Sequence, residues 1–97
     1  MPTFIVSLSW TDQGVRSLKD APKRAQAGRE LAKKMGAEIK QIYLTTGEAD
    51  LLAVVEAPNG DNVAKLALAL SAQGNVRTRI SRAWTEPEFQ KLIAELP

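Results

Sequence analysis

The segment at residues 51–55, LLAVV, contains no polar side chain. Side chains of a β-strand point alternately to its two faces, so a strand that is apolar at every position needs cover on both faces. Such a strand belongs in the middle of a sheet rather than at its edge. The rest of this chain must therefore provide neighbouring strands and cover for two faces.

Three further segments have the composition or the period of strands. Residues 3–10 alternate between Phe4, Val6, Leu8 and Trp10, which we expect to face a core, and Thr3, Ile5, Ser7 and Ser9 on the other side. Residues 37–46 and 50–57 are separated by Gly47, Glu48 and Ala49, which predicts an antiparallel hairpin. Residues 76–84 alternate again and form the fourth predicted strand.

Two helical segments lie between these strands. Apolar residues at steps of three and four predict a helix in two pieces before Gly36, with the main piece starting at Asp20 as N-cap. The second helix is predicted at residues 61–73, with Asp61 as N-cap and Gly74 as terminator. Residues 63–72 are apolar around most of the helix, so a further element must cover them.

The C-terminal segment begins with a capping box, TEPE at residues 85–88. In this motif the Thr85 hydroxyl and the Glu88 carboxylate each accept a hydrogen bond from a free backbone N–H group. The apolar face of the helix that follows consists of Phe89, Leu92, Ile93 and Leu96. We expect this third helix to cover the second one.

The order of strands and helices predicts one domain over residues 1–97 with an α+β, ferredoxin-like βαββαβ fold and an extra C-terminal helix. Right-handed crossovers put both main helices on one face of a four-stranded antiparallel sheet of order 4-1-3-2. The other face is then open, with Ile5, Ser7, Arg79 and Ser81 on it. Its central strip is apolar, which predicts that a second copy or a ligand covers it. Two such faces packed together make a dimeric α/β barrel.

The composition excludes several kinds of chemistry. The chain has no Cys and no His, which removes disulfides, thiolate nucleophiles, the usual general base near neutral pH and the commonest metal ligand. We therefore expect no metal and no cofactor. No run approaches the roughly 18 apolar residues of a membrane span, and no signal peptide precedes the first strand, so we expect a cytoplasmic protein without a membrane partner.

Nucleic acid is not an expected partner either. The net charge is only +2, and the central strands lack the aromatic side chains on which an RNA-binding sheet stacks bases. The first helix has six basic residues on its outer side, Lys19, Lys23, Arg24, Arg29, Lys33 and Lys34. We interpret them as a solvated face rather than a phosphate site.

Asp50 stands at the start of the most apolar strand and allows two interpretations. Its carboxylate either accepts hydrogen bonds from backbone N–H groups around Gly47 and fixes the hairpin, or acts as a polar group at one end of a cavity beside Tyr43 and Arg79. Arg79 either binds a carboxylate or phosphate or protects an edge strand from aggregation. The candidate ligand pocket consists of Ser7, Tyr43, Asp50, Arg79 and Ser81, with no catalytic residue assigned.

The segments "MPTFIVSLSWTDQGVRSLKDAPKRA", "YLTTGEADLLAVVEAP" and "LALALSAQGNVRTRISRAWTEPEF" resemble the GYD domain family over essentially the whole chain. The Gly-x-Tyr-Asp hairpin of that family stands here as Gly47, Glu48, Ala49 and Asp50, so Ala49 replaces the tyrosine. The resemblance implies a ferredoxin-like fold, homo-oligomers of the dimeric-barrel kind, and no established biochemical activity.

These features favour a homo-oligomeric binding or accessory module whose cavity between sheet faces takes a small anionic or apolar metabolite. One alternative is a cofactor-independent enzyme of the dimeric-barrel type, acting by proton transfer or in the manner of a monooxygenase. The other is a purely structural oligomer. The absence of His, Cys and any catalytic motif favours binding over catalysis.

Overall fold

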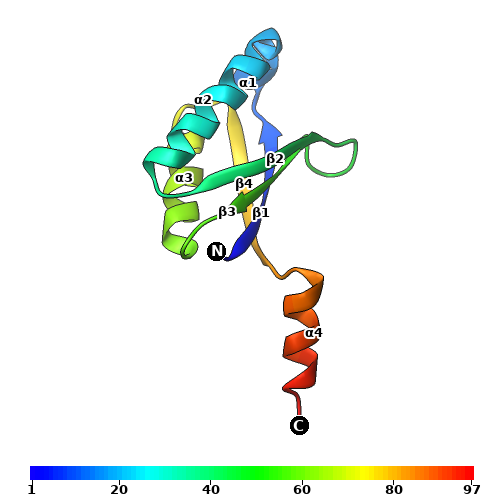
Figure 1. Ribbon diagram of the computed structural model, residues 1–97. Helices are drawn as coiled ribbons and strands as arrows, with labels where there is room; N and C mark the ends of the chain where they lie inside the picture. The colour runs from blue at the N-terminus through cyan, green and yellow to red at the C-terminus, as the bar shows by residue number, and fades with distance from the viewer.

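The computed structural model describes all 97 residues (Figure 1). Its elements in chain order are β1 (Thr3–Trp10), α1 (Asp12–Arg16), a 3₁₀ helix (Leu18–Asp20), α2 (Ala21–Lys34), β2 (Glu38–Leu44), β3 (Leu51–Glu56), α3 (Gly60–Ala72), β4 (Val76–Ala83) and α4 (Glu86–Ala94). None of these helices combines the length and the apolar character that a membrane crossing requires.

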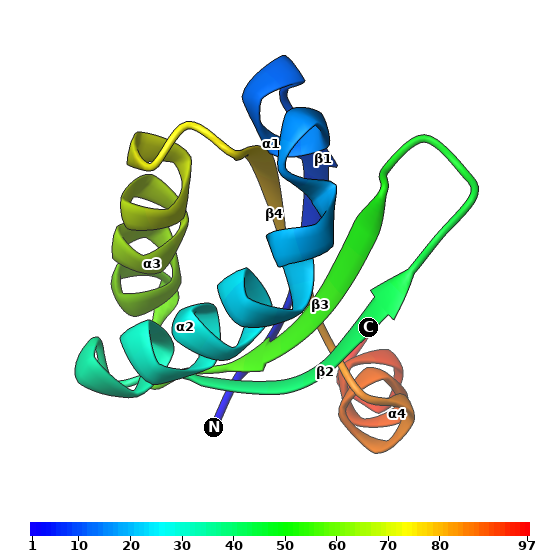
Figure 2. The same cartoon turned by 90° about the horizontal axis from the view of Figure 1, so that it is seen from above.

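The four strands form one antiparallel sheet of order β2-β3-β1-β4. The predicted order and the ferredoxin-like α+β fold are therefore confirmed. The apolar strand β3 lies inside the sheet, as its composition requires. Helices α2 and α3 both lie on one side of the sheet, and no element of the chain covers the other side (Figure 2).

The strand register arranges the uncovered side in rows across the sheet. Directly paired residues of neighbouring antiparallel strands point to the same face. The first row is Tyr43, Leu52, Ser7 and Arg79, and the second is Gln41, Val54, Ile5 and Ser81. We call the surface made by these two rows, together with Ser9 and Arg77, the open face. Its middle is apolar and its edges are polar, as predicted.

The hydrophobic core lies between the other face of the sheet and the helices α2 and α3. Its buried apolar residues are Phe4, Val6, Ala32, Ala37, Ala53, Val55, Ala57, Val63, Leu66 and Ala67. Half of them are alanines, which remove much less apolar surface from water than larger side chains do. The core of a single chain is consequently thin.

The two predicted glycine terminators are confirmed. Gly36 follows α2 with a φ of 76°, and Gly74 follows α3 with a φ of 86°. Only glycine adopts this left-handed conformation without a steric penalty, and it is the conformation that commonly ends a helix.

The predictions at the N-termini of α2 and α3 were only partly right. Asp20 occupies the N-cap position of α2, but it makes no side-chain capping bond, because the 3₁₀ helix holds its backbone in the right-handed helical region and runs directly into α2. The cap of α3 is Asn59, whose Oδ1 accepts from the backbone N–H of Asp61 at 2.9 Å and of Asn62 at 3.3 Å. Asp61 lies inside the first turn, where its negative charge interacts favourably with the positive end of the helix dipole.

The capping box of α4 is confirmed, but the predicted position of α4 was wrong. Thr85 N–H donates to Glu88 Oε1 at 2.8 Å, and Glu88 N–H donates to Thr85 Oγ1 at 3.4 Å. The extended residues Trp84 and Thr85 carry the chain past the end of the sheet, so α4 projects away from the body (Figure 1). The radius of gyration is accordingly 14.5 Å, against about 12.5 Å for a compact chain of this length. Helix α4 therefore does not cover α3, where the side chain of Leu68 remains 70% exposed.

Candidate functional site

Four of the five residues predicted for the ligand pocket lie on the open face. Ser7, Tyr43 and Arg79 share the first row, and Ser81 lies in the second. The Tyr43 hydroxyl donates to Gln41 Oε1 of the second row. The prediction that Ser7, Arg79 and Ser81 share one face of the sheet is therefore confirmed, and Tyr43 joins them on it.

Asp50 lies apart from them, in the loop between β2 and β3. Its Oδ2 accepts a hydrogen bond from the backbone N–H of Trp10 at 2.9 Å, while its own N–H donates to the carbonyl oxygen of Leu8 at 3.0 Å. The expected bonds around Gly47 do not form. Asp50 instead extends the pairing of β3 with β1 beyond the last paired residues, Leu8 and Leu51.

The loop that carries Asp50 also closes on itself. Thr45 N–H donates to the carbonyl oxygen of Asp50 at 2.8 Å, and Thr45 Oγ1 donates to the carbonyl oxygen of Ala49 at 2.5 Å. These bonds fix the loop in place between its two strands. Glu48 and Ala49 are therefore held beside the open face.

A cavity of about 280 Å³ lies between this loop and strands β1 and β4. We call it the polar cavity. Its lining consists of Ser7, Ser9, Glu48, Ala49, Arg77, Thr78 and Arg79. Two serine hydroxyl groups, two guanidinium groups and one carboxylate thus border one space at the edge of the open face.

The two guanidinium groups of the polar cavity have no acidic partner within the chain. The only ion pair joins Lys40 Nζ to Glu38 Oε1 at 3.5 Å. On the neighbouring strands β1 and β4, Arg77 pairs with Ser9 and Arg79 pairs with Ser7. Each arginine therefore lies directly opposite a serine on the same face of the sheet. A carboxylate or phosphate fits such donors, because the planar guanidinium fork binds two oxygens at once.

Sequence reasoning missed Ser9, Arg77 and Glu48 as lining residues. Ser9 lies two residues after Ser7, and Arg77 lies two residues before Arg79, so each shares a strand face with a predicted residue. The alternation in the sequence could therefore have indicated both. The place of Glu48 depends on how the loop folds back over β1 and β4, which no local pattern shows.

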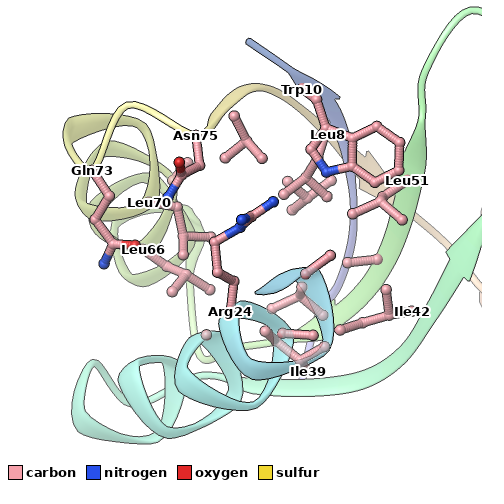
Figure 3. Close-up of a pocket in the computed structure, with 18 of the residues that line it drawn as sticks. Leu8, Trp10, Arg24, Ile39, Ile42, Leu51, Leu66, Leu70, Gln73 and Asn75 are labelled. Carbon is pink, nitrogen blue, oxygen red and sulfur yellow. The ribbon is translucent and has the colours of Figure 1, made fainter. Parts of the chain in front are cut away.

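A second cavity, of about 90 Å³, lies on the helix side of the sheet (Figure 3). Its lining is almost wholly apolar and includes the core residues Val6, Val55 and Leu66. The space exists because small residues stand where helices and sheet meet, namely Ala21, Ala25, Gly28, Ala53 and Ala67. We call it the apolar cavity, and it is a gap in the core.

Arg24 at the mouth of the apolar cavity corrects one further expectation. It was assigned to the solvated face of α2, but it is only partly exposed and lies between Leu70 and Leu8 (Figure 3). Its Nη1 donates to Ser17 O at 2.7 Å and to Ser17 Oγ at 3.0 Å, and its Nη2 donates to Gly14 O at 3.2 Å. Arg24 therefore holds the segment before α2 over the cavity and has few donors left for a ligand.

The comparisons with known proteins agree with this architecture. The model of the GYD domain matches residues 4–93. The chain belongs to the GYD domain family. A relative in Thermus thermophilus, named glutamine synthetase and cystathionine beta-lyase binding protein, is 37% identical over 79 residues, which cover 80% of this chain and 83% of the relative.

Solved structures share the fold of this GYD domain. The feast or famine regulatory protein of M. tuberculosis, complexed with L-methionine, is 20% identical with a TM-score of 0.66 over 88% of this chain. A protein from Thermus thermophilus is 21% identical with a TM-score of 0.56, over 88% of this chain and 95% of its own length. The present chain spans about half of the length of the mycobacterial regulator, 51%.

The hairpin that gives the GYD family its name lies at the polar cavity. Ala49 stands at the tyrosine position and lines the cavity, next to Glu48 on the same wall. The aspartate position is Asp50, whose carboxylate is bound to Trp10 N–H. In this GYD domain the aspartate thus fixes the loop, and the alanine leaves space beside it.

Proposed function

We propose that this GYD domain is a homo-oligomeric accessory module that binds a small anionic ligand in the polar cavity. The observation that carries the proposal is the convergence of two unpaired guanidinium groups, Arg77 and Arg79, on a cavity with the hydroxyl groups of Ser7 and Ser9. Carboxylates and phosphates are the ligands that such a donor set recognises.

The open face supports the homo-oligomer. Ile5, Leu52 and Val54 form a partly exposed apolar strip across the middle of the sheet. Removing this strip from water against the same strip of a second chain contributes about 2.5 kcal/mol for each 100 Å² of apolar surface, which must offset the entropy that two chains lose when they associate. The polar cavity at the edge of the open face then lies next to the junction of the two sheets of a dimeric α/β barrel.

The relative in Thermus thermophilus supports the accessory role, because its name describes a protein that binds two enzymes. The position of Asp50 points the same way. Its carboxylate was the candidate acid or base, and it is bound to the backbone N–H of Trp10 instead of facing the polar cavity. We therefore infer that this chain binds other molecules and propose no reaction for it.

Native mass spectrometry tests the oligomer and any carried ligand in one spectrum. We expect a dimer or a larger assembly for the wild-type chain. Val54→Asp places a charge on the apolar strip and is expected to yield monomers, whereas Ala27→Asp, at an exposed position of α2, should leave the assembly intact. A wild-type chain that is monomeric at micromolar concentration contradicts the proposed oligomer.

Isothermal titration calorimetry with inorganic phosphate and with succinate tests the polar cavity. We expect binding that Arg79→Ala and Arg77→Ala each weaken by about tenfold or more, and that Arg16→Ala, the change of an exposed arginine on α1, leaves unchanged. Ala49→Tyr fills the cavity with the family's own residue and should also abolish binding. Equal affinity of wild type and Arg79→Ala for both probes contradicts the assignment.

A further inference from the structure

Helix α4 exposes an apolar face that its own chain leaves uncovered. Its four large apolar side chains are Phe89, Leu92, Ile93 and Leu96, with exposed fractions of 52%, 46%, 54% and 65%. They recur at steps of three and four and so share one stripe of the helix. An isolated helix of only nine residues is marginal in water, so α4 depends on packing against something outside its own chain.

The position of α4 indicates what that partner is. Helices α2 and α3 lie on one side of the sheet, and α4 projects beyond the sheet on the side of the open face (Figures 1 and 2). A second chain seated on the open face therefore lies on the side of α4.

The distribution of charge favours the same partner. Residues 1–84, which we call the body, contain 12 basic and 8 acidic side chains and have a net charge of +4. Residues 85–97 contain 3 acidic and 1 basic side chain and have a net charge of −2. A negative helix is attracted to a positive body and is repelled by an anionic membrane surface.

The body also offers an apolar side chain that its own α4 does not reach. Leu44, at the end of the edge strand β2, is 71% exposed. Its exposure leaves apolar surface at this edge of the sheet that a helix from another chain can cover. Helix and body of different copies thus complement each other in both charge and apolar surface.

The joint between β4 and α4 is held in the projecting direction. The Arg82 guanidinium lies 4.6 Å from the ring centroid of Trp84 and 5.7 Å from that of Phe4. Its Nη1 also donates to the carbonyl oxygen of Thr3 at 3.1 Å. Through Arg82 these contacts link Trp84, two residues before α4, to Phe4 and Thr3 at the end of the sheet. The helix is therefore presented outward, and little freedom is lost when it docks.

We propose that α4 is an arm that docks by its apolar face on the body of a second copy of this chain. The proposal rests on the proposed homo-oligomer and adds to it a contact outside the open face. Each chain of the pair then gives one arm and receives one.

A first experiment measures the dimer dissociation constant by analytical ultracentrifugation. Phe89→Ser/Leu92→Ser removes two apolar side chains of the arm, and Gln90→Ser/Lys91→Arg changes two exposed residues on its other side without changing its charge. We expect the first double variant to raise the dissociation constant by about tenfold or more, and the second to leave it nearly unchanged. If both variants dimerise as well as the wild type, the docking of α4 on the second copy is wrong and the open-face dimer stands. A monomeric wild type overturns both.

A second experiment locates the arm and uses the absence of cysteine in the native chain. Chains with Leu92→Cys are mixed with chains that carry Leu44→Cys, at the edge of the sheet, or Leu68→Cys, on the far side of α3, and are then oxidised. Each chain has a single thiol, so every disulfide joins two copies. We expect Leu92→Cys to form a mixed disulfide with Leu44→Cys and much less with Leu68→Cys, and Gln90→Cys to form little with either. Disulfides of Leu92→Cys only with itself, or none at all, overturn the proposal.

Discussion

Asp50 Oδ2 accepts a hydrogen bond from the backbone N–H of Trp10 across 2.9 Å, so the loop after β2 is tied to the last residue of β1. The two residues are 40 positions apart in the sequence. The bond satisfies a partly buried donor at the end of β1, where the sheet ladder has no further backbone acceptor from β3. Asp50 thus stabilises the hairpin on which Glu48 and Ala49 border the polar cavity.

Replacing Asp50 should lower stability. Asp50→Ala leaves the Trp10 N–H without an acceptor, and we expect the free energy of unfolding to fall by about 1–2 kcal/mol. Asp50→Asn keeps an acceptor oxygen and should cost less. Urea denaturation measures both, with Glu48→Ala as a control of nearly unchanged stability. Full stability of Asp50→Ala contradicts this structural role of Asp50.

Two glycine substitutions should have opposite effects. Gly28 lies inside α2, and a Cβ atom there meets only Leu70 Cδ2, at 3.8 Å. Gly28→Ala should therefore raise the free energy of unfolding by about 0.5–1 kcal/mol, because alanine loses less backbone entropy in a helix. Gly14→Ala should lower it, since a Cβ atom there lies 2.2 Å from Asn75 O. Thermal unfolding followed by circular dichroism compares the two variants, and a destabilised Gly28→Ala contradicts the described packing of α2 on α3.

The stability of the first turn of α4 should depend on pH through Glu88. Hydrogen bonds from the backbone N–H and then the hydroxyl of Thr85 lower the pKa of Glu88. A carboxylate with a lowered folded pKa contributes stability that is complete above the ordinary glutamate value of about 4.3. This contribution is lost as the pH falls through the lower folded pKa.

An NMR titration of the Thr85 amide signal measures this effect. We expect a midpoint below that of an unbonded glutamate in the wild type and no such transition in Glu88→Gln, which serves as the matched control. A midpoint at the ordinary glutamate value shows that the capping box is open in solution.

Arg82 should contribute to stability through the joint before α4. Arg82→Gln removes a cation–π contact and a bond to Thr3 O, and we expect a loss of about 1 kcal/mol in the free energy of unfolding. In a Trp10→Phe background Trp84 is the only tryptophan, so its fluorescence reports the joint directly. Arg16→Gln, at an exposed position on α1, is the control. An unchanged emission spectrum of Trp84 in Arg82→Gln contradicts the stacking.

Several local features could be predicted because neighbouring residues decide them. The alternation in β1 and β4 brought Ser7, Arg79 and Ser81 to the open face, since the period of a strand needs no distant partner. The terminator Gly36 and the capping box of Thr85 and Glu88 likewise depend on residues within one turn. The GYD hairpin was visible as a sequence motif, whereas its use in binding Trp10 was not.

Tertiary structure decided the rest. Asp20 makes no capping bond because it ends a 3₁₀ helix, and Arg24 left the solvated face because Ser17 and Gly14 offered it carbonyl oxygens. The partner of Asp50 and the direction of α4 depend on contacts between segments far apart in the chain. The sequence by itself determined the strands, most helix ends and the polar edge of the open face, because local periods and caps are short-range. The bond partners, the two cavities and the projecting arm were decided only when distant segments met, because a donor pairs with whichever acceptor the fold brings within reach.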